Sequence, residues 1–229
     1  MSRSGPSDGG VPLLVGLAGR RVVGVGGGAV ATAKLLPLAE AGAEVIVVAP
    51  NVQGELAAAA GVVHRRAYSG PQDLAGAFLA GAAPADASVN AWVAADAEAL
   101  ATLCVRVDRD PDAATAPRSA AGSAAFAAAV RRGPLTIAVS TDGQAPSLAR
   151  LLRAELEDTY GPEYGEVAAL LGELRGDPAV RRHLATLDSD GRRAAWRAIP
   201  LADILRLIRK GLVLDARELA LACLSSSSD

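Results

Sequence analysis

Three consecutive glycines, Gly26–Gly28, constrain this chain more than any other feature, because of the segments on either side of them. The apolar, β-branched segment 21–25 before them is typical of a strand, and the segment 32–42 after them is typical of a helix that ends at a glycine. A second apolar segment, 44–50, follows and is also typical of a strand. This order of strand, glycine turn, helix and strand is the context of a dinucleotide-binding fingerprint, with the small Ala31 at the third position. The sequence therefore predicts a nucleotide-binding βαβ unit.

The glycine turn also predicts where a cofactor would bind. Glycines let the backbone approach a pyrophosphate, and the N-terminus of the next helix offers free N–H donors and a partial positive charge. The second strand ends without the acidic residue that commonly holds ribose hydroxyls, and no arginine follows directly to favour a 2′-phosphate. These features favour NAD over NADP. The candidate cofactor-binding residues in this unit are Gly26, Gly27, Gly28, Ala29, Val30, Pro50 and Asn51.

Apolar strands alternate with Ala-rich helices from about residue 11 to residue 108, which favours an α/β fold with a Rossmann-like, doubly wound parallel sheet. In its second half we expect strands at 62–66 and 103–107, a helix at 72–80, a loop at 82–90 and a helix at 91–101. A turn at 132–134 and a strand at 135–140 come next. Helical periodicity follows, and we expect helices from about 148 and at about 165–175, 178–186, 189–198 and 200–209.

This pattern predicts three parts. They are an NAD-binding domain at 11–115, a small central dimerisation segment at 116–147 and a helical C-terminal domain at 148–224.

Composition excludes few functions. The formal net charge of the 229 residues is −2, which gives no argument for binding nucleic acid or an anionic membrane surface. The two cysteines have no disulfide or metal-ligand spacing and fit a reducing cytosol, so we expect a cytoplasmic protein without a metal site. All but two of the 23 basic residues are arginines, whose planar guanidinium pairs well with carboxylates.

Several segments together resemble one family. They occur in the family's order from Pro12 to Glu157, and the block at 132–153 is the most specific, because generic dinucleotide-binding domains lack it. The matching segments are 12–23, 25–31 with Lys34, 41–45, 89–90, 107–108, 132–141 and 145–153 with Glu157. In these residues the chain resembles the precorrin-2 dehydrogenase and sirohydrochlorin ferrochelatase family of siroheme biosynthesis, which includes the amino-terminal part of siroheme synthase.

The resemblance implies NAD-dependent oxidation of precorrin-2, an anionic tetrapyrrole, to sirohydrochlorin by a homodimer, and some members of the family also chelate iron. It implies that Asp108 is the catalytic aspartate, which accepts a proton during the oxidation. From its position alone, Asp108 is either a cap after a strand or a carboxylate at the ligand crevice of the sheet. The resemblance adds Ala83 and Asn90 to the cofactor site.

The substrate is expected to contact residues in the later part of the chain. The candidates are Ser140, Arg118, Arg150 and Arg153, and Arg131 and Arg132 could also face the substrate. For the arginines, the alternative is that they are solvated charges on helices and turns. The loop Ala83–Asp86 departs from the family's usual sequence. Two rival functions therefore stay open, a non-catalytic or regulatory NAD(P)-binding homologue and an oxidoreductase that acts on another substrate.

Overall fold

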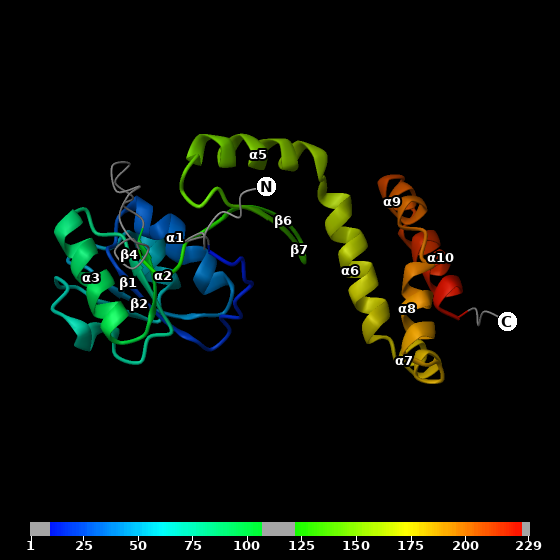
Figure 1. The fold of residues 1–229 in the computed structure, drawn as a ribbon, viewed down its shortest axis with the longest axis horizontal. Coiled ribbons are helices and arrows are strands. Elements are labelled where there is room, and N and C mark those ends of the chain that lie inside the picture. The colour runs from blue at the N-terminus through cyan, green and yellow to red at the C-terminus, as the bar shows by residue number, and fades with distance from the viewer. Residues whose placement is uncertain (1–9, 107–121, 226–229) are drawn as a thin grey trace, which may run out of the picture. The chain divides into compact units, whose positions relative to one another are not determined.

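A computed structural model of the protein describes residues 10–106 and 122–225. The chain forms two compact units, which divide between Phe126 and Ala127 (Figure 1). The three-part division expected from the sequence stays a prediction. Each unit is described by itself below.

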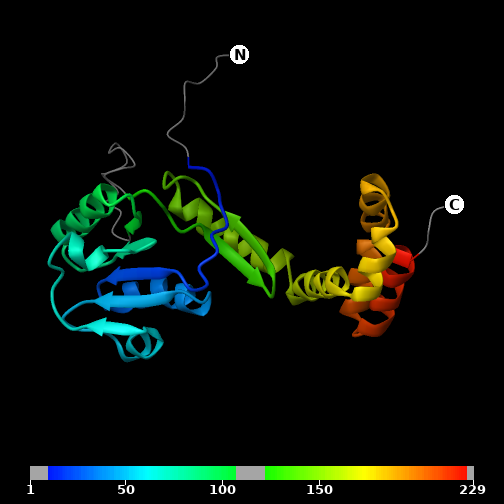
Figure 2. The ribbon, with the colours of Figure 1, turned by 90° about the horizontal axis from the view of Figure 1, so that it is seen from below.

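The first unit is built on one sheet of five parallel strands (Figure 2). The strands lie in the order β3-β2-β1-β4-β5, so the chain moves outward from β1 in one direction and then crosses to β4 on its other side. Their bounds are Arg21–Val25 for β1, Glu44–Val48 for β2, Val62–His64 for β3, Leu79–Ala82 for β4 and Leu103–Arg106 for β5. This is the doubly wound sheet that the sequence predicted.

Helices cover both faces of this sheet. On one face, Leu35 of α1 and Leu56 of α2 pack against Val22 and Val47 of the strands. On the other face, the alternate strand residues pack against Val93 of α3 and the 3₁₀ turn η1. These elements span Ala29–Glu40 (α1), Gly54–Ala59 (α2), Pro71–Leu74 (η1) and Ala87–Ala99 (α3). The prediction of an α/β Rossmann-like fold is confirmed.

One stretch of the first unit was predicted wrongly. The helix expected at 72–80 is instead the short turn η1 followed by the strand β4, and α3 begins inside the expected loop. The sequence of β4 is Leu-Ala-Gly-Ala, which lacks β-branched residues, so its strand character is hidden. All four of its residues are buried between two paired strands, and a Cβ at Gly81 would lie 3.2 Å from Leu35 Cδ2. Small residues occupy β4 because a helix packs closely on it.

The second unit begins with an antiparallel hairpin, β6 (Ala128–Arg132) and β7 (Leu135–Val139), followed by the helix α5 (Pro146–Thr159). Arg132 ties the hairpin to the end of α5, because its guanidinium donates to the carbonyls of Tyr160 (2.9 Å) and Glu157 (3.1 Å). This role in the fold differs from the substrate contact considered for Arg132.

Five further helices pack around one apolar core in the second unit (Figure 1). Leu174, Ile204 and Leu224 are almost fully buried in that core. The helices are α6 (Pro162–Gly176), α7 (Pro178–Ala185), α8 (Ser189–Arg197), α9 (Leu201–Arg209) and α10 (Val213–Ser225). The first four were expected within a few residues, whereas α10 was not predicted. Within the described ranges, no helix is both long and apolar enough to cross a bilayer.

Candidate functional site

A cleft of about 530 Å³ lies at the carboxyl edge of the sheet. Three segments line it, and each directly follows a strand. The first wall, residues 26–30, follows β1; the second wall, residues 49–51, follows β2; and the third wall, residues 83–85, follows β4. Strands β1 and β4 are neighbours at the point where the strand order reverses. Open α/β sheets bind their ligands in the crevice at this position.

The glycine turn is shaped by close backbone contacts. A Cβ at Gly26 would lie 2.4 Å from the carbonyl oxygen of Ala83, and φ there is +117°, in the region that favours glycine. A Cβ at Gly27 would lie 2.2 Å from the carbonyl oxygen of Asn51. The first two glycines therefore let the three walls of the cleft approach one another.

Gly28 differs from its two neighbours. A Cβ at this position would meet nothing within 4 Å, and φ is −81°, which any residue can adopt. Gly28 is the N-cap of α1 and lines the cleft, and no side chain caps the helix there. The first N–H groups of α1 lack partners within the helix, so the turn leaves room and donors for an anion. The residues present thus fit the pyrophosphate of a dinucleotide.

A pair of polar side chains fixes the second wall to the turn. The Thr32 hydroxyl lies 3.0 Å from the carbonyl oxygen of Gly28 and 3.1 Å from Gln53 Oε1, and it can donate to either. The backbone N–H of Gln53 donates to the carbonyl of Gly27 at 2.9 Å. These bonds hold the segment 49–51 against the start of α1.

The third wall rests on a buried amide. Asn90 is 1% exposed, and its Nδ2 donates to the carbonyl of Pro84 at 3.1 Å. Its Oδ1 is buried and has no hydrogen-bond partner among the described residues. Asp86 begins α3 by accepting from the N–H of Ser88 at 2.8 Å. Residues 83–85, which belong to the segment that departs from the family's usual sequence, therefore still form one side of the cleft.

Most of the predicted cofactor-binding residues come together here. Gly26, Gly27, Gly28, Ala29, Val30, Pro50, Asn51 and Ala83 line the cleft, whereas Asn90 supports it from behind. Sequence reasoning missed Ala49, Pro84 and Ala85, which also line it, and the bond between Thr32 and Gln53. Ala49, Pro84 and Ala85 adjoin predicted residues, so recognising β4 as a strand would have indicated the third wall.

The candidate substrate residues that the structure describes belong to the second unit. Ser140 and Arg150 are exposed, and the Ser140 hydroxyl accepts from the N–H of Asp142 at 3.2 Å. Arg153 pairs with Glu157 at 2.8 Å one helical turn away on α5. The catalytic candidate Asp108 and the substrate candidate Arg118 lie outside the described residues.

A partly buried ion pair of the first unit lies in the loop after β3. Arg66 forms a bidentate ion pair with the buried carboxylate of Asp73, in which Nη1 donates to Oδ2 at 2.8 Å and Nη2 donates to Oδ1. The N–H of Ser69 also donates to Asp73, at 2.9 Å. The Arg66 guanidinium is the main cause that lowers the pKa of Asp73 from 3.8 to about 2. Neither residue of the pair lines the cleft, so the ion pair stabilises the loop.

Comparison with known proteins agrees with this geometry. Residues 13–116 match the family described as putative NAD(P)-binding, and residues 132–159 match the family described as sirohaem biosynthesis protein central. The siroheme synthase of Pseudomonas putida (strain W619) is 47% identical over 169 residues, which are 72% of this chain and 34% of that protein. The chain belongs to the family of the amino-terminal part of siroheme synthase.

Other relatives extend the match along the chain. The siroheme synthase of Azotobacter vinelandii (strain DJ / ATCC BAA-1303) is 36% identical over 222 residues, which are 95% of this chain and 45% of that protein. The chain thus spans less than half the length of these siroheme synthases. The solved structure of SirC, a precorrin-2 dehydrogenase, has a TM-score of 0.65 and 24% identity, and the match covers 94% of this chain and 100% of that one. This likeness shows that the two proteins share a fold.

Proposed function

We propose that this protein is an NAD-dependent dehydrogenase that oxidises precorrin-2 to sirohydrochlorin in siroheme biosynthesis. The observation that carries this proposal is the glycine-walled cleft at the switch point of the sheet, in a chain that aligns over 72% of its length with a siroheme synthase. The name precorrin-2 dehydrogenase belongs to its structural neighbour, and the cleft supplies the site that such an enzyme needs.

The cofactor would lie along the three walls of the cleft. NAD⁺, when bound, supplies the acceptor for the hydride that leaves the substrate. The free N–H groups at the start of α1 would hold its pyrophosphate beside Gly28, and Pro50 and Asn51 would contact the adenosine ribose. No basic residue stands among 49–53 to attract a 2′-phosphate, which supports NAD over NADP.

Asp108 is proposed as the proton acceptor. It follows the end of β5 by two residues in the sequence, and the carboxyl ends of parallel strands face the ligand crevice. Removing a hydride from precorrin-2 leaves a proton to be lost, and a carboxylate close to the reacting carbon can accept it. The oxidation then balances, with two electrons and one proton going to NAD⁺ as hydride and the second proton going to the carboxylate.

The second unit would help to bind the tetrapyrrole. Arg150, Arg153 and Arg118 are proposed to pair with its carboxylates, and Ser140 to donate a hydrogen bond. Arg153 and Glu157 are both partly exposed, so exchanging this pair for a substrate carboxylate costs little.

We also propose that the protein is a cytoplasmic homodimer and that the second unit contributes the interface. The helix α5 has no buried residue, although Leu148 is 46% exposed and Leu151 is 56% exposed on it. Strands β6 and β7 pair only with each other among the described strands. A second copy would cover both features across a two-fold axis. A monomeric mass by light scattering at micromolar concentration would contradict this proposal.

Substitution of Asp108 tests the catalytic role. We expect Asp108→Ala to fold, to bind NAD normally and to lose about two orders of magnitude or more in anaerobic turnover of precorrin-2, the scale of a positioned acid or base. If Asp108 instead caps a turn, the melting temperature should fall by the equivalent of about 1 kcal/mol while turnover stays nearly intact. A wild-type protein that binds NAD but never oxidises precorrin-2 would favour the regulatory alternative, to which the altered segment 83–86 points.

A further inference from the structure

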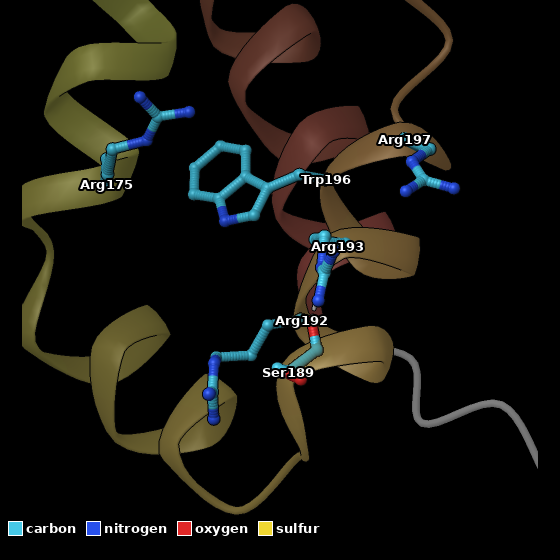
Figure 3. Close-up of a pocket in the computed structure, with 6 residues that line it drawn as sticks. All are labelled: Arg175, Ser189, Arg192, Arg193, Trp196 and Arg197. Carbon is cyan, nitrogen blue, oxygen red and sulfur yellow. Dashed lines mark hydrogen bonds between the residues drawn. The ribbon is translucent and has the colours of Figure 1, made fainter.

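A second hollow, distinct from the NAD cleft, lies within the helical part of the second unit. It has a volume of about 410 Å³ and is formed by the C-terminal turn of α6 and one side of α8 (Figure 3). Its lining residues are Arg175, Ser189, Arg192, Arg193, Trp196 and Arg197. Neither the proposed reaction nor the family match at 132–159 gives this arginine pocket a role.

The aromatic ring of the pocket is held in place by the apolar core of the helices. Trp196 is half-buried and packs against the apolar core of the helices. The guanidinium of Arg175 lies over the indole, with its Cζ 4.8 Å from the ring centroid. Figure 3 shows Trp196 reaching from α8 toward α6, with Arg175 across from it and Arg192 below. The ring is therefore a fixed surface with cations at its margin.

The positive charge of the pocket is poorly balanced. Of its four arginines, Arg193 alone has a carboxylate partner in the part of the chain that the structure describes. That partner is Asp190, at 3.2 Å, and both side chains are mostly exposed. Such an exposed pair is easily exchanged, because solvent and salt screen it. Among the described residues, Arg192 donates only to the backbone carbonyl of Leu187, and it keeps further N–H groups for a ligand.

We infer that the arginine pocket binds a small polyanion that carries several carboxylate or phosphate groups. Guanidinium groups bind both kinds of oxyanion with paired hydrogen bonds, and the Trp196 indole adds a stacking surface for a planar ring. A carboxylate ligand would come from the acidic tetrapyrrole of the proposed reaction, and this source rests on the proposed function. A phosphate ligand would come from a nucleotide. The inference that the pocket binds an anion is the same for either source.

Fluorescence of the 229-residue chain can report on this pocket alone. The sequence has two tryptophans, and the other, Trp92, is on α3 with an edge contact to Tyr68 at 5.2 Å. The substitution Trp92→Phe keeps a ring in that contact and leaves Trp196 as the sole indole emitter. The protein is then titrated with benzenehexacarboxylate and, separately, with inorganic triphosphate. Saturable change in Trp196 emission with at least one probe is expected.

An adjacent pair of arginines on α7, the helix before α8, provides the matched control. The variant Arg192→Gln/Arg193→Gln removes two charges from the pocket, and Arg181→Gln/Arg182→Gln removes two exposed charges of α7 that do not line it. We expect the pocket variant to lose about tenfold or more in affinity for the probe, since two charge-assisted contacts disappear, and the α7 variant to lose less than about threefold.

Each outcome decides the inference. Tighter binding of benzenehexacarboxylate assigns the carboxylate source, and tighter binding of triphosphate assigns the nucleotide source. Equal losses in the two arginine variants would show non-specific attraction and overturn the inference, as would the absence of saturable binding by either probe. The NAD affinity of the same variants, measured by calorimetry, should be unchanged. A failure of the arginine-pocket inference is therefore distinguishable from a failure of the proposed function.

Discussion

The two hollows of this protein are lined by different kinds of chemical group. The NAD cleft of the first unit is walled by backbone and small side chains, with Val30 the largest aliphatic group at its edge. The arginine pocket of the second unit is walled by long charged side chains and one indole. A backbone cleft presents fixed N–H donors and depends on close approach, whereas a side-chain pocket depends on charge and can rearrange. We therefore expect added side-chain volume to weaken binding in the NAD cleft, and removal of charge to weaken binding in the arginine pocket.

The largest effect is expected at Gly28. Because a Cβ at this position would meet nothing within 4 Å beyond the adjacent backbone, Gly28→Asp should fold normally, and the new carboxylate can serve as the N-cap of α1. Its carboxylate would stand where the cofactor pyrophosphate approaches, so NAD affinity should fall by about a hundredfold or more, equivalent to about 2.7 kcal/mol. Titration calorimetry and thermal melting measure the two effects separately.

The matched control for this change is Gly28→Ala, which adds one methyl group without charge. It should bind NAD more tightly than Gly28→Asp at an unchanged melting temperature. Undiminished NAD binding by Gly28→Asp would place the cofactor away from the glycine turn.

Substitution of the neighbouring Gly27, unlike that of Gly28, should lower the stability of the fold. In Gly27→Ala the new methyl group would lie 2.2 Å from the carbonyl oxygen of Asn51, so the second wall must move. We expect a loss of about 1–3 kcal/mol in the free energy of unfolding, the usual cost of overpacking, together with weaker NAD binding. Urea denaturation measures the loss in the free energy of unfolding. A variant as stable as the wild type would mean that the walls of the cleft are less closely packed than described.

Much of this cleft could be predicted from the sequence, because a glycine turn between a strand and a helix is a local pattern. Its first two walls follow from consecutive residues. The third wall was partly missed, since the small residues of β4 carry no strand signal and owe their conformation to pairing with β1 and β5. Ala83 and Asn90 were reached only through the resemblance to a family.

The arginine pocket shows the limit of such reasoning more sharply. Arg175 and Arg192 stand 17 positions apart on two helices, and no local pattern indicates that they flank one indole. The arginine-rich composition indicates an affinity for carboxylates but does not indicate where such a site lies. Packing of α6 against the other helices brings these charges together, and it depends on an apolar core whose last helix, α10, was not predicted.

A further test concerns stability outside either hollow. In the folded protein the pKa of Asp73 is lowered to about 2, so its ion pair with Arg66 stabilises the fold above the ordinary value of 3.8 and is lost as pH falls through about 2. At neutral pH, Asp73→Asn should lower the free energy of unfolding by about 2 kcal/mol and leave NAD affinity unchanged. The difference from the wild type should shrink below about pH 4. If the difference in unfolding free energy between the wild type and Asp73→Asn stays constant from neutral to acid pH, the ion pair is not the cause of that difference.

The smallest effect is expected at Asn90. Replacement by alanine removes the hydrogen bond to the Pro84 carbonyl and leaves a small void behind the third wall. We expect a loss of about 1 kcal/mol in stability and a weakening of NAD binding by about fivefold, since the wall is loosened but keeps its backbone. Calorimetry at matched temperature tests this, and a loss of affinity as large as that of Gly28→Asp would instead mean that Asn90 contacts the cofactor directly.

Anaerobic incubation of the wild-type protein with precorrin-2 and NAD⁺ tests the central claim most directly. The absorbance of NADH and of sirohydrochlorin is followed together, with Gly28→Asp as the control whose cleft is blocked. The account predicts that both products form in equal amounts with the wild type, and that neither forms with the variant at the same cofactor concentration. Binding of NAD by the wild type without formation of either product would contradict it.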